Sequence, residues 1–181
     1  MKLFLFVSLS VPLVWLSRKS LVSLRHHGLY RLMSWESILF LFLDSYQSWF
    51  AKPFNTNQIV SWILLIASLV LVIPGVVSMK KTGTQNRERA DDSLFEFEKT
   101  TQLIETGIFG KVRHPLYGSL VLLTWGIVFK NLSLTPLAVA ALSTIFLVLT
   151  ALVEEREDIE YFGERYVTYM KRTKMSVPFI L

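Results

Sequence analysis

The chain has 181 residues, of which 52% are hydrophobic and 18% are charged, and its mean hydropathy is +0.44. It contains no cysteine, which excludes disulfides, thiolate metal sites and cysteine nucleophiles, and we predict no metal site. The net charge of +5 is compatible with binding to nucleic acid. However, the hydrophobic residues form long blocks separated by short charged stretches, and this pattern favours a membrane protein without a nucleic-acid partner.

Five hydrophobic segments predict membrane-spanning helices. A helix rises about 1.5 Å per residue, so about 20 residues cross a hydrocarbon core of about 30 Å. The segments, in chain order, are Lys2–Leu16, Met33–Phe50, Ile59–Met79, Leu116–Phe129 and Leu132–Val153. The first and fourth are short and must tilt or extend into flanking residues. The last two are separated only by Lys130 and Asn131, which predicts a tight antiparallel helical hairpin.

The basic residues predict the orientation of these helices. Of the 19 Lys and Arg residues, 16 fall in the connection 17–32, the connection 80–115 and the tail after Val153. Five spans place all three segments on one side, which the positive-inside rule assigns to the cytoplasm. The first segment has its stronger charge behind it and no small-residue cleavage site, so we expect a retained span with its N-terminus outside.

We therefore expect an all-α, polytopic, multi-pass integral membrane protein with a cytoplasmic C-terminus. It should form a single domain over residues 1–181, with three N-terminal spans in 1–79, a cytoplasmic connection in 80–115, and a hairpin with a C-terminal segment in 116–181. The oligomeric state does not follow from the sequence.

Two features within the spans interrupt the hydrophobic pattern. Pro74 and Gly75 should kink or fray the third span. Glu36 and Asp44 lie in the second span, where a carboxylate is costly and suggests a function. Glu36 can alternatively be an interfacial residue paired with Arg31, whereas the sequence identifies no partner for Asp44.

The connection before the fourth segment ends in a polar motif, Arg113-His114-Pro115-Leu116-Tyr117-Gly118. Proline favours the first position of a helix and disfavours a helical residue before it, so His114 should be extended and Pro115 should open the helix. The free N–H groups of a first helical turn can bind an anion, and Arg113, His114 and Tyr117 add donors beside them. The alternative is a basic helix end that anchors to lipid phosphates, with Tyr117 in an aromatic belt.

A second polar cluster, from Glu154 to Tyr166, follows the fifth segment. Apolar residues recur at helical spacing at Ile159, Phe162 and Tyr166, which predicts an amphipathic helix lying under the membrane. Most of its charges should form a solvated face. Glu154 and Glu155 leave the hydrocarbon first, and we expect one of them, Glu155 in preference, to face a pocket among the helices, because adjacent helical residues point about 100° apart.

Together these segments resemble the membrane methyltransferases that include isoprenylcysteine carboxyl methyltransferases and phospholipid N-methyltransferases. The resemblance covers about residues 100–180. The matching residues are Leu103–Gly107, then Arg113-His114-Pro115-x-Tyr117-Gly118, Glu154-Glu155, Phe162-Gly163-x-x-Tyr166-x-x-Tyr169-x-x-Arg172, and Pro178. The Gly-x-x-Trp-Ser-like motif and the histidine that members often carry before Gly107 are replaced here by other residues, which bears on the acceptor more than on the cofactor.

The resemblance implies S-adenosylmethionine as methyl donor and a lipophilic acceptor that enters from the bilayer. Arg113, His114, Pro115, Tyr117, Gly118, Glu154 and Glu155 are then the expected cofactor-binding residues. Arg172 and Glu155 are the expected catalytic residues, with Arg172 holding an anionic group of the acceptor. The acceptor atom can be a carboxylate of the isoprenylcysteine type or an amine of the phospholipid type. The alternatives are a nicotinamide-dependent membrane reductase and a non-catalytic membrane scaffold.

Overall fold

The structure, a computed structural model, describes residues 1–18, 27–82 and 102–176. This part of the chain forms six α-helices and contains no β-strand, so the expected all-α fold is confirmed there. The helices are α1 (Lys2–Ser17), α2 (Gly28–Ser45), α3 (Thr56–Thr82), α4 (Pro115–Val128), α5 (Leu134–Phe162) and α6 (Glu164–Arg172). Two short 3₁₀ turns, η2 (Tyr46–Ser48) and η3 (Gly107–Gly110), join them.

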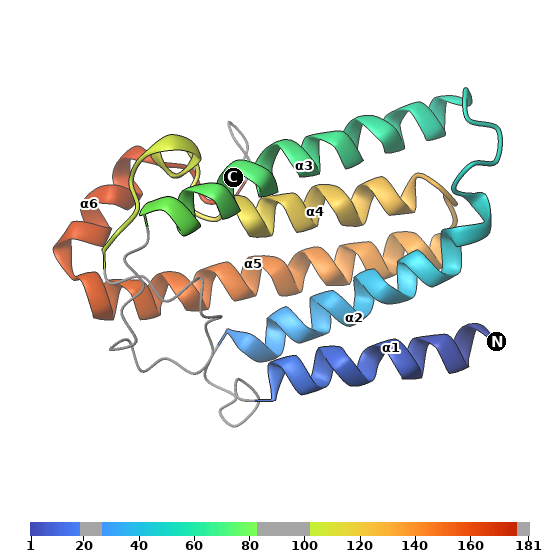
Figure 1. Cartoon of the computed structure of the whole chain (residues 1–181), viewed down its shortest axis with the longest axis horizontal. Coiled ribbons are helices and arrows are strands. Elements are labelled where there is room, and N and C mark those ends of the chain that lie inside the picture. Colours follow the sequence, from blue (N-terminus) through green and yellow to red (C-terminus); the bar gives the residue numbers. More distant parts are fainter. Residues whose placement is uncertain (19–26, 83–101, 177–181) are drawn as a thin grey trace.

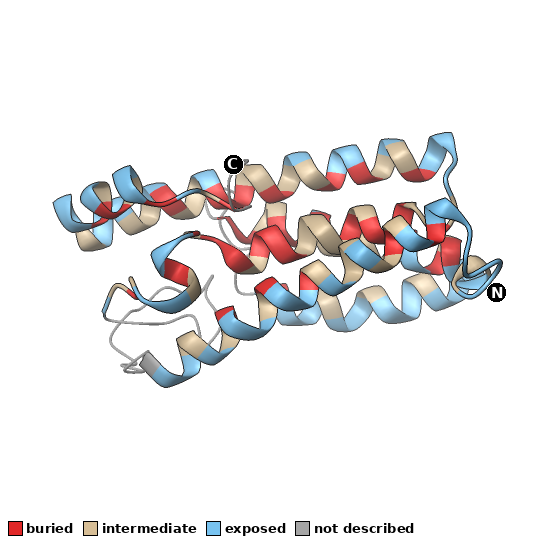
Figure 2. Cartoon of the chain, turned by 90° about the horizontal axis from the view of Figure 1, so that it is seen from above, coloured by how far each residue is buried: buried red, intermediate tan, exposed pale blue. Residues whose placement is uncertain are grey.

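The five long helices lie side by side and alternate in direction (Figure 1). In the bundle, α3 packs on α4, α4 on α5, α5 on α2, and α2 on α1. The start of α2, the start of α4 and the end of α5 therefore lie at one end of the molecule, next to α6. This alternation agrees with the one that the basic residues predict, and buried residues line the facing sides of the helices (Figure 2).

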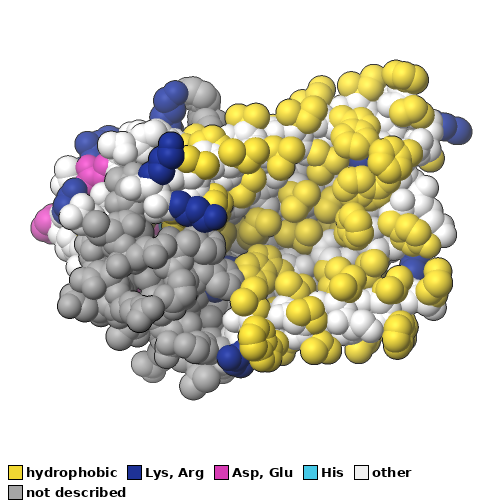
Figure 3. Space-filling model, viewed as in Figure 1, with side chains coloured by type: hydrophobic (Ala, Val, Ile, Leu, Met, Phe, Trp, Pro, Cys, Tyr) yellow, Lys and Arg dark blue, Asp and Glu magenta, His cyan; other side chains and the backbone are white. Residues whose placement is uncertain are grey.

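The helices differ in how well they suit a bilayer. By length and composition, α3 and α5 can cross a membrane, whereas α1 and α4 are shorter apolar helices. The outward faces are apolar: Val7, Ile63, Ile66 and Ile145 are all exposed. Figure 3 shows this apolar surface along the bundle, with most of the visible charges near the end that carries α6. Such a surface is typical of a protein that contacts lipid, while the number of spans stays a prediction.

The predictions for three helices need correction. The second helix begins at Gly28 instead of Met33 and ends at Ser45, where η2 takes over. The fifth helix continues beyond Val153 to Phe162 and carries Glu154 and Glu155 on its last turns. The predicted C-terminal amphipathic helix is interrupted at Gly163, whose φ of 62° is readily adopted only by glycine.

Pro74 does not end α3, which continues to Thr82. Gly75 instead allows close packing between α3 and α4, because a Cβ there would lie 2.9 Å from Leu116 Cδ1. This contact packs the start of α4 against α3. It therefore fixes the position of Arg113 and His114, which directly precede α4, along the axis of the bundle.

The two carboxylates of the second span have partners on α1. Asp44 pairs with Lys2 at 3.4 Å, which identifies the partner that the sequence could not. Glu36 accepts a hydrogen bond of 2.6 Å from Ser10, whereas the guanidinium of Arg31 lies over the ring of Trp35. These contacts give both carboxylates a role in holding α1 against α2.

The connection between α4 and α5 is clamped at the opposite end of the bundle. Lys130 is buried there, donates a hydrogen bond of 2.9 Å to Gln58 Oε1, and lies 3.5 Å from the centre of the Trp62 ring. Since Gln58 and Trp62 belong to α3, this cation ties the predicted α4–α5 hairpin to a third helix.

Candidate functional site

The site is built where the chain after α6 returns to the start of α4. The N–H of Arg113 donates to the carbonyl of Lys174 at 2.8 Å, and the N–H of His114 donates to the carbonyl of Met175 at 2.8 Å. The N–H of Lys174 donates in turn to Lys111 at 3.0 Å. Backbone pairing therefore holds residues 173–176 against residues 111–114, an arrangement that helical periodicity cannot predict.

Pro115 opens α4 and His114 precedes it as the N-cap with φ −117°, as the sequence predicts. Gly118 lies one turn further along, directly under the returning segment. A Cβ at Gly118 would come within 2.0 Å of the carbonyl oxygen of Ser176. Gly118 is therefore needed for the approach of the C-terminal segment, and Pro115 sets the helix start; neither contributes a polar side chain.

Arg113 connects three elements through its guanidinium. Its Nε donates to Glu155 Oε1 at 2.7 Å, and Nη1 donates to the carbonyls of Thr173 at 2.6 Å and Met170 at 3.2 Å. Both side chains of the ion pair are more than nine-tenths buried. Arg113 thus joins the start of α4 to α5 and to the end of α6. These contacts within the protein favour a role in positioning the site, in addition to the predicted contact with the cofactor.

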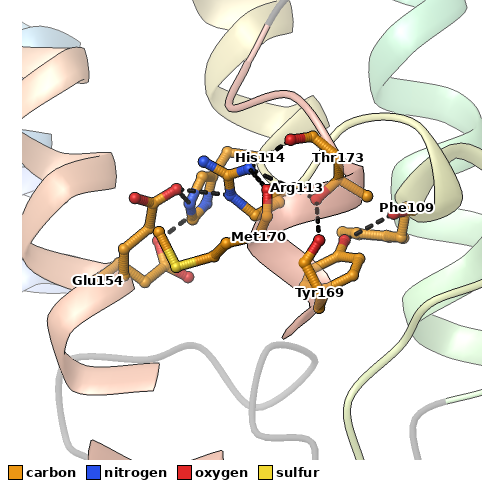
Figure 4. A network of polar contacts seen from close by, with 8 residues as sticks. Phe109, Arg113, His114, Glu154, Tyr169, Met170 and Thr173 are labelled. Carbon is orange, nitrogen blue, oxygen red and sulfur yellow. Dashed lines mark hydrogen bonds and ion pairs between the residues drawn. The ribbon is translucent and has the colours of Figure 1, made fainter. Parts of the chain in front are cut away.

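His114 lies between the two carboxylates at the end of α5. Its Nδ1 is 3.8 Å from Glu154 Oε2, and its Nε2 is 3.5 Å from Glu155 Oε1. Figure 4 shows Arg113 and His114 between Glu154 on α5 and Thr173, the residue that follows α6. The ring of Tyr117 stacks on that of His114 with centroids 5.5 Å apart. Five of the predicted site residues are therefore brought into one cluster at the end of the bundle.

The apolar face of α6 packs on the protein. Tyr166 and Tyr169 are buried, and the hydroxyl of Tyr169 donates to the carbonyl of Phe109 in η3 at 2.6 Å. Burial raises the pKa of both phenols, so they stay neutral at physiological pH. The amphipathic pattern was predicted correctly, but Tyr166 and Tyr169 pack against the protein and not against a lipid surface.

Arg172 lies apart from the cluster. It is about half exposed, stacks near the Tyr169 ring, and forms an ion pair with Glu105, which Arg165 also contacts at 3.0 Å. Burial works to raise the pKa of Glu105, but the two arginines outweigh it and lower the pKa. Sequence analysis missed Glu105 as a partner, although it lies within the matching stretch Leu103–Gly107. The role of Arg172 towards an acceptor stays a prediction.

The N-terminal half also reaches the site, which sequence analysis missed. His27, the N-cap of α2, is fully buried, and its Nδ1 lies 2.7 Å from Glu157 Oε2 on α5. Burial works to lower the pKa of His27. The hydrogen bond with Glu157 and the charges of Glu154 and Glu157 outweigh burial and the opposing charge of Arg31, so the pKa is raised. In the sequence, His27 follows another histidine in a basic connection, and nothing in that pattern predicts its contact with Glu157.

Several buried polar atoms of the cluster have no hydrogen-bond partner in the described part of the chain. They are His114 Nε2 and Glu154 Oε2, which make ion-pair contacts of 3.5 Å and 3.8 Å without hydrogen-bond geometry, and His27 Nε2 beside the cluster. Buried polar groups are usually paired, so such a concentration suits a ligand with polar groups of both charges. S-adenosylmethionine, with a carboxylate, an amino group, ribose hydroxyls and a sulfonium, fits this donor and acceptor set. Residues 1–18, 27–82 and 102–176 hold no group of three or more His, Asp or Glu residues suited to a metal ion.

Comparisons with known proteins identify relatives of this region. A family model described as phospholipid methyltransferase matches residues 56–165, which include Arg113, His114, Glu154 and Glu155. The methanethiol S-methyltransferase of Pseudomonas deceptionensis is 33% identical over 67 residues, which cover 37% of this chain and 25% of that protein. Methanethiol S-methyltransferase 1 of Bradyrhizobium diazoefficiens is 32% identical over 82 residues, which cover 45% of this chain and 28% of that protein.

The match to these relatives is thus partial, since it spans about a quarter of their length. No solved structure matches the chain. The matched family model covers α3, α4 and α5 but neither His27 nor Arg172.

Proposed function

Because this chain belongs to the phospholipid methyltransferase family, whose members use S-adenosylmethionine, we propose that it transfers a methyl group from this cofactor to a lipophilic acceptor at a membrane. The observation that carries the proposal is the convergence of His114 with Glu154 and Glu155 at one end of an apolar helical bundle. His114 Nε2 and Glu154 Oε2 are buried there without a hydrogen-bond partner among the described residues, and the face of the bundle seen in Figure 3 is largely apolar.

We assign each residue of the cluster a task in binding the cofactor. His114 and Tyr117 hold the carboxylate of the cofactor, and Glu154 accepts hydrogen bonds from its amino group or ribose. Glu155 orients His114 and, through Arg113, the segment that closes the site. The cofactor supplies an activated methyl group when bound, so the protein contributes mainly by orienting the reactants and excluding water.

The acceptor is a separate part of the proposal. The named relatives act on methanethiol, which favours a thiol as the acceptor here. An amine of the phospholipid type and a carboxylate of the isoprenylcysteine type are the two competing acceptors. The apolar bundle surface suits any of the three, because each is reached from the hydrocarbon or from its edge.

Two measurements test the proposal in order. Calorimetric titration of the detergent-purified full chain with S-adenosylmethionine should give saturable binding, and a nicotinamide dinucleotide control should give none. His114→Ala and Tyr117→Phe should weaken binding by about ten- to a hundredfold, as expected for a lost hydrogen bond to a charged group. Binding of the nicotinamide cofactor alone would support a reductase and overturn the proposal.

The acceptor is then identified by transfer of a labelled methyl group. The protein in lipid nanodiscs is supplied with methanethiol, a farnesylcysteine analogue or phosphatidylethanolamine in parallel reactions. We expect label in the thioether product. Label in the lipid amine or in the methyl ester would replace the thiol while keeping the methyltransferase, and cofactor binding without transfer to any of the three would contradict the acceptor classes.

A further inference from the structure

His27 occupies an unusual position for a residue outside the region that the family model matches. Its ring is completely buried at the start of α2, and its Nδ1 lies 2.7 Å from Glu157 Oε2. Its Nε2 is buried without a hydrogen-bond partner among the described residues. A buried imidazole with one free nitrogen is costly unless a further group uses it.

Glu154 connects His27 to the site. Glu154 and Glu157 are three residues apart on α5, so their side chains lie on one face of the helix. Glu154 Oε2 lies 3.8 Å from His114 Nδ1, the charge of Glu154 acts on both His27 and His114, and Oε2 accepts no hydrogen bond from any described residue. Among residues 27–82 and 102–176, the charged groups that act on His27 are Glu154 and Glu157 from α5 and Arg31 from its own helix.

We propose that His27 is a positioning residue that competes with the positively charged cofactor for the charge of Glu154. Protonation of His27 then weakens binding of the cofactor, whose sulfonium is positively charged. It weakens binding of the product S-adenosylhomocysteine less, because the thioether sulfur of the product is uncharged. The inference rests on the proposed function and adds to it a contribution of the N-terminal half of the chain. Its consequence is that the site prefers cofactor over product more strongly as the pH rises.

The charge of His27 affects the binding of the two ligands differently. The contact of His27 Nδ1 with Glu157 Oε2 at 2.7 Å favours the imidazolium form, so the pKa of His27 is raised and its proton is lost at a higher pH than that of an ordinary histidine. When Glu154 holds the amino group or ribose of either ligand, the imidazolium repels the sulfonium of the cofactor, whereas it does not repel the neutral thioether sulfur of the product. The amino and carboxylate groups are common to both ligands, but the sulfonium lowers the pKa of the cofactor's amino group, and this contribution to the pH dependence remains in a variant without His27.

The test is calorimetric titration of the full chain in detergent with S-adenosylmethionine and with S-adenosylhomocysteine between pH 6 and pH 8.5. We expect the ratio of the two affinities to shift by about fivefold or more in favour of the sulfonium as His27 loses its proton, which is the usual lower range for coupled sites. In His27→Gln the contribution of His27 is lost, so the ratio should change with pH clearly less than in the unmodified protein.

A second variant keeps the test independent of whether His27→Gln folds. Glu157→Gln removes the group that holds the proton on His27, so the midpoint of the shift should move to lower pH. Glu160→Gln, which removes an exposed carboxylate from the same helix, is the matched control and should leave the midpoint unchanged. A merely structural role of His27 would not move a midpoint.

The outcomes separate this inference from the proposed function. If both ligands bind but their ratio is independent of pH in the unmodified protein, the inference is wrong and the proposed function stands. The same holds if the pH dependence is as large in His27→Gln as in the unmodified protein, which would assign it to another group. If neither ligand binds at any pH, the proposed function fails and the inference fails with it.

Discussion

Arg113 Nε donates a hydrogen bond of 2.7 Å to Glu155 Oε1, and both side chains are almost fully buried. The same guanidinium also holds the carbonyl of Thr173. One side chain at the start of α4 thereby fixes the end of α5 and the chain that follows α6. The cluster around His114 depends on this junction, because it sets the distance between the α4 motif and the α5 carboxylates.

Replacing Arg113 by Gln should destabilise the protein strongly. Glu155 would keep a buried charge without its partner, which typically costs about 3–5 kcal/mol. Thermal unfolding in a non-ionic detergent measures the effect. Lys171→Gln is the matched control, since it removes an exposed cation from α6 and should change the midpoint little. Equal midpoints for the two variants would contradict the assigned role of Arg113.

Replacing Gly118 by Ala should displace the C-terminal segment. The added methyl group would lie 2.0 Å from the carbonyl oxygen of Ser176, and a core overlap usually costs about 1–3 kcal/mol. Cofactor affinity should fall as well, because this segment pairs with Arg113 and His114. Gly163→Ala is the comparison: it strains a positive φ without any neighbour within 4 Å, so it should reduce stability while leaving affinity intact.

The helices and the site were predictable from the sequence to different degrees. Hydrophobic blocks locate α1, α3 and α4 well, because burial in lipid or protein needs long apolar stretches. The limits of α2 and α5 were missed, because polar residues such as Arg31 and Glu155 continue a helix when a neighbouring element pairs with them. Local propensity contains no information about such distant partners.

The motifs predicted which end of the bundle carries the site, but not its connections. His114 and Glu154 were found as members of two separate segments, and their spatial proximity follows from the α4–α5 hairpin. The contacts of His27 with Glu157 and of Arg172 with Glu105 join positions 130 and 67 residues apart. Only the tertiary packing of α2, α5 and α6 determines these pairs.

Glu105 should make stability depend on pH in the acid range. Its pKa is lower in the folded protein than the ordinary value of 4.5, through Arg165 and Arg172. Its stabilising contribution is therefore present above pH 4.5 and is lost as the pH falls through the lower, folded-state pKa. The midpoint difference between the unmodified protein and Glu105→Gln should shrink on acidification from pH 7 to pH 3.5. A difference that stays constant or grows would contradict the ion pairs.

The predicted orientation can be tested with single cysteines, because the chain has none of its own. Thr56, Ser133 and Glu164 are exposed and lie at known ends of the helices. With the N-terminus outside, an impermeant maleimide should label Thr56→Cys and Ser133→Cys in intact cells. Glu164→Cys should react only after permeabilisation. The opposite labelling pattern would reverse the orientation, and labelling of all three would contradict a span between them.

The two carboxylates at the end of α5 should respond differently to substitution. Glu155 contacts Arg113 and His114, so Glu155→Gln should lower both the unfolding temperature and most of the turnover. Glu154 Oε2 has no hydrogen-bond partner in the part of the chain that the structure describes. Glu154→Gln should therefore mainly weaken cofactor binding, by about ten- to a hundredfold if a charged acceptor is lost.

Cofactor affinity, turnover and unfolding temperature of the two variants, measured well below both unfolding midpoints, separate these roles. Glu160→Gln controls for the removal of one negative charge from α5, since that carboxylate is exposed. Exposed charges seldom change stability by more than about 0.5 kcal/mol, so this control should match the unmodified protein. If Glu154→Gln and Glu155→Gln also match it in all three measurements, the acidic pair is only a solvated helix end. The cofactor site then lies elsewhere in the bundle.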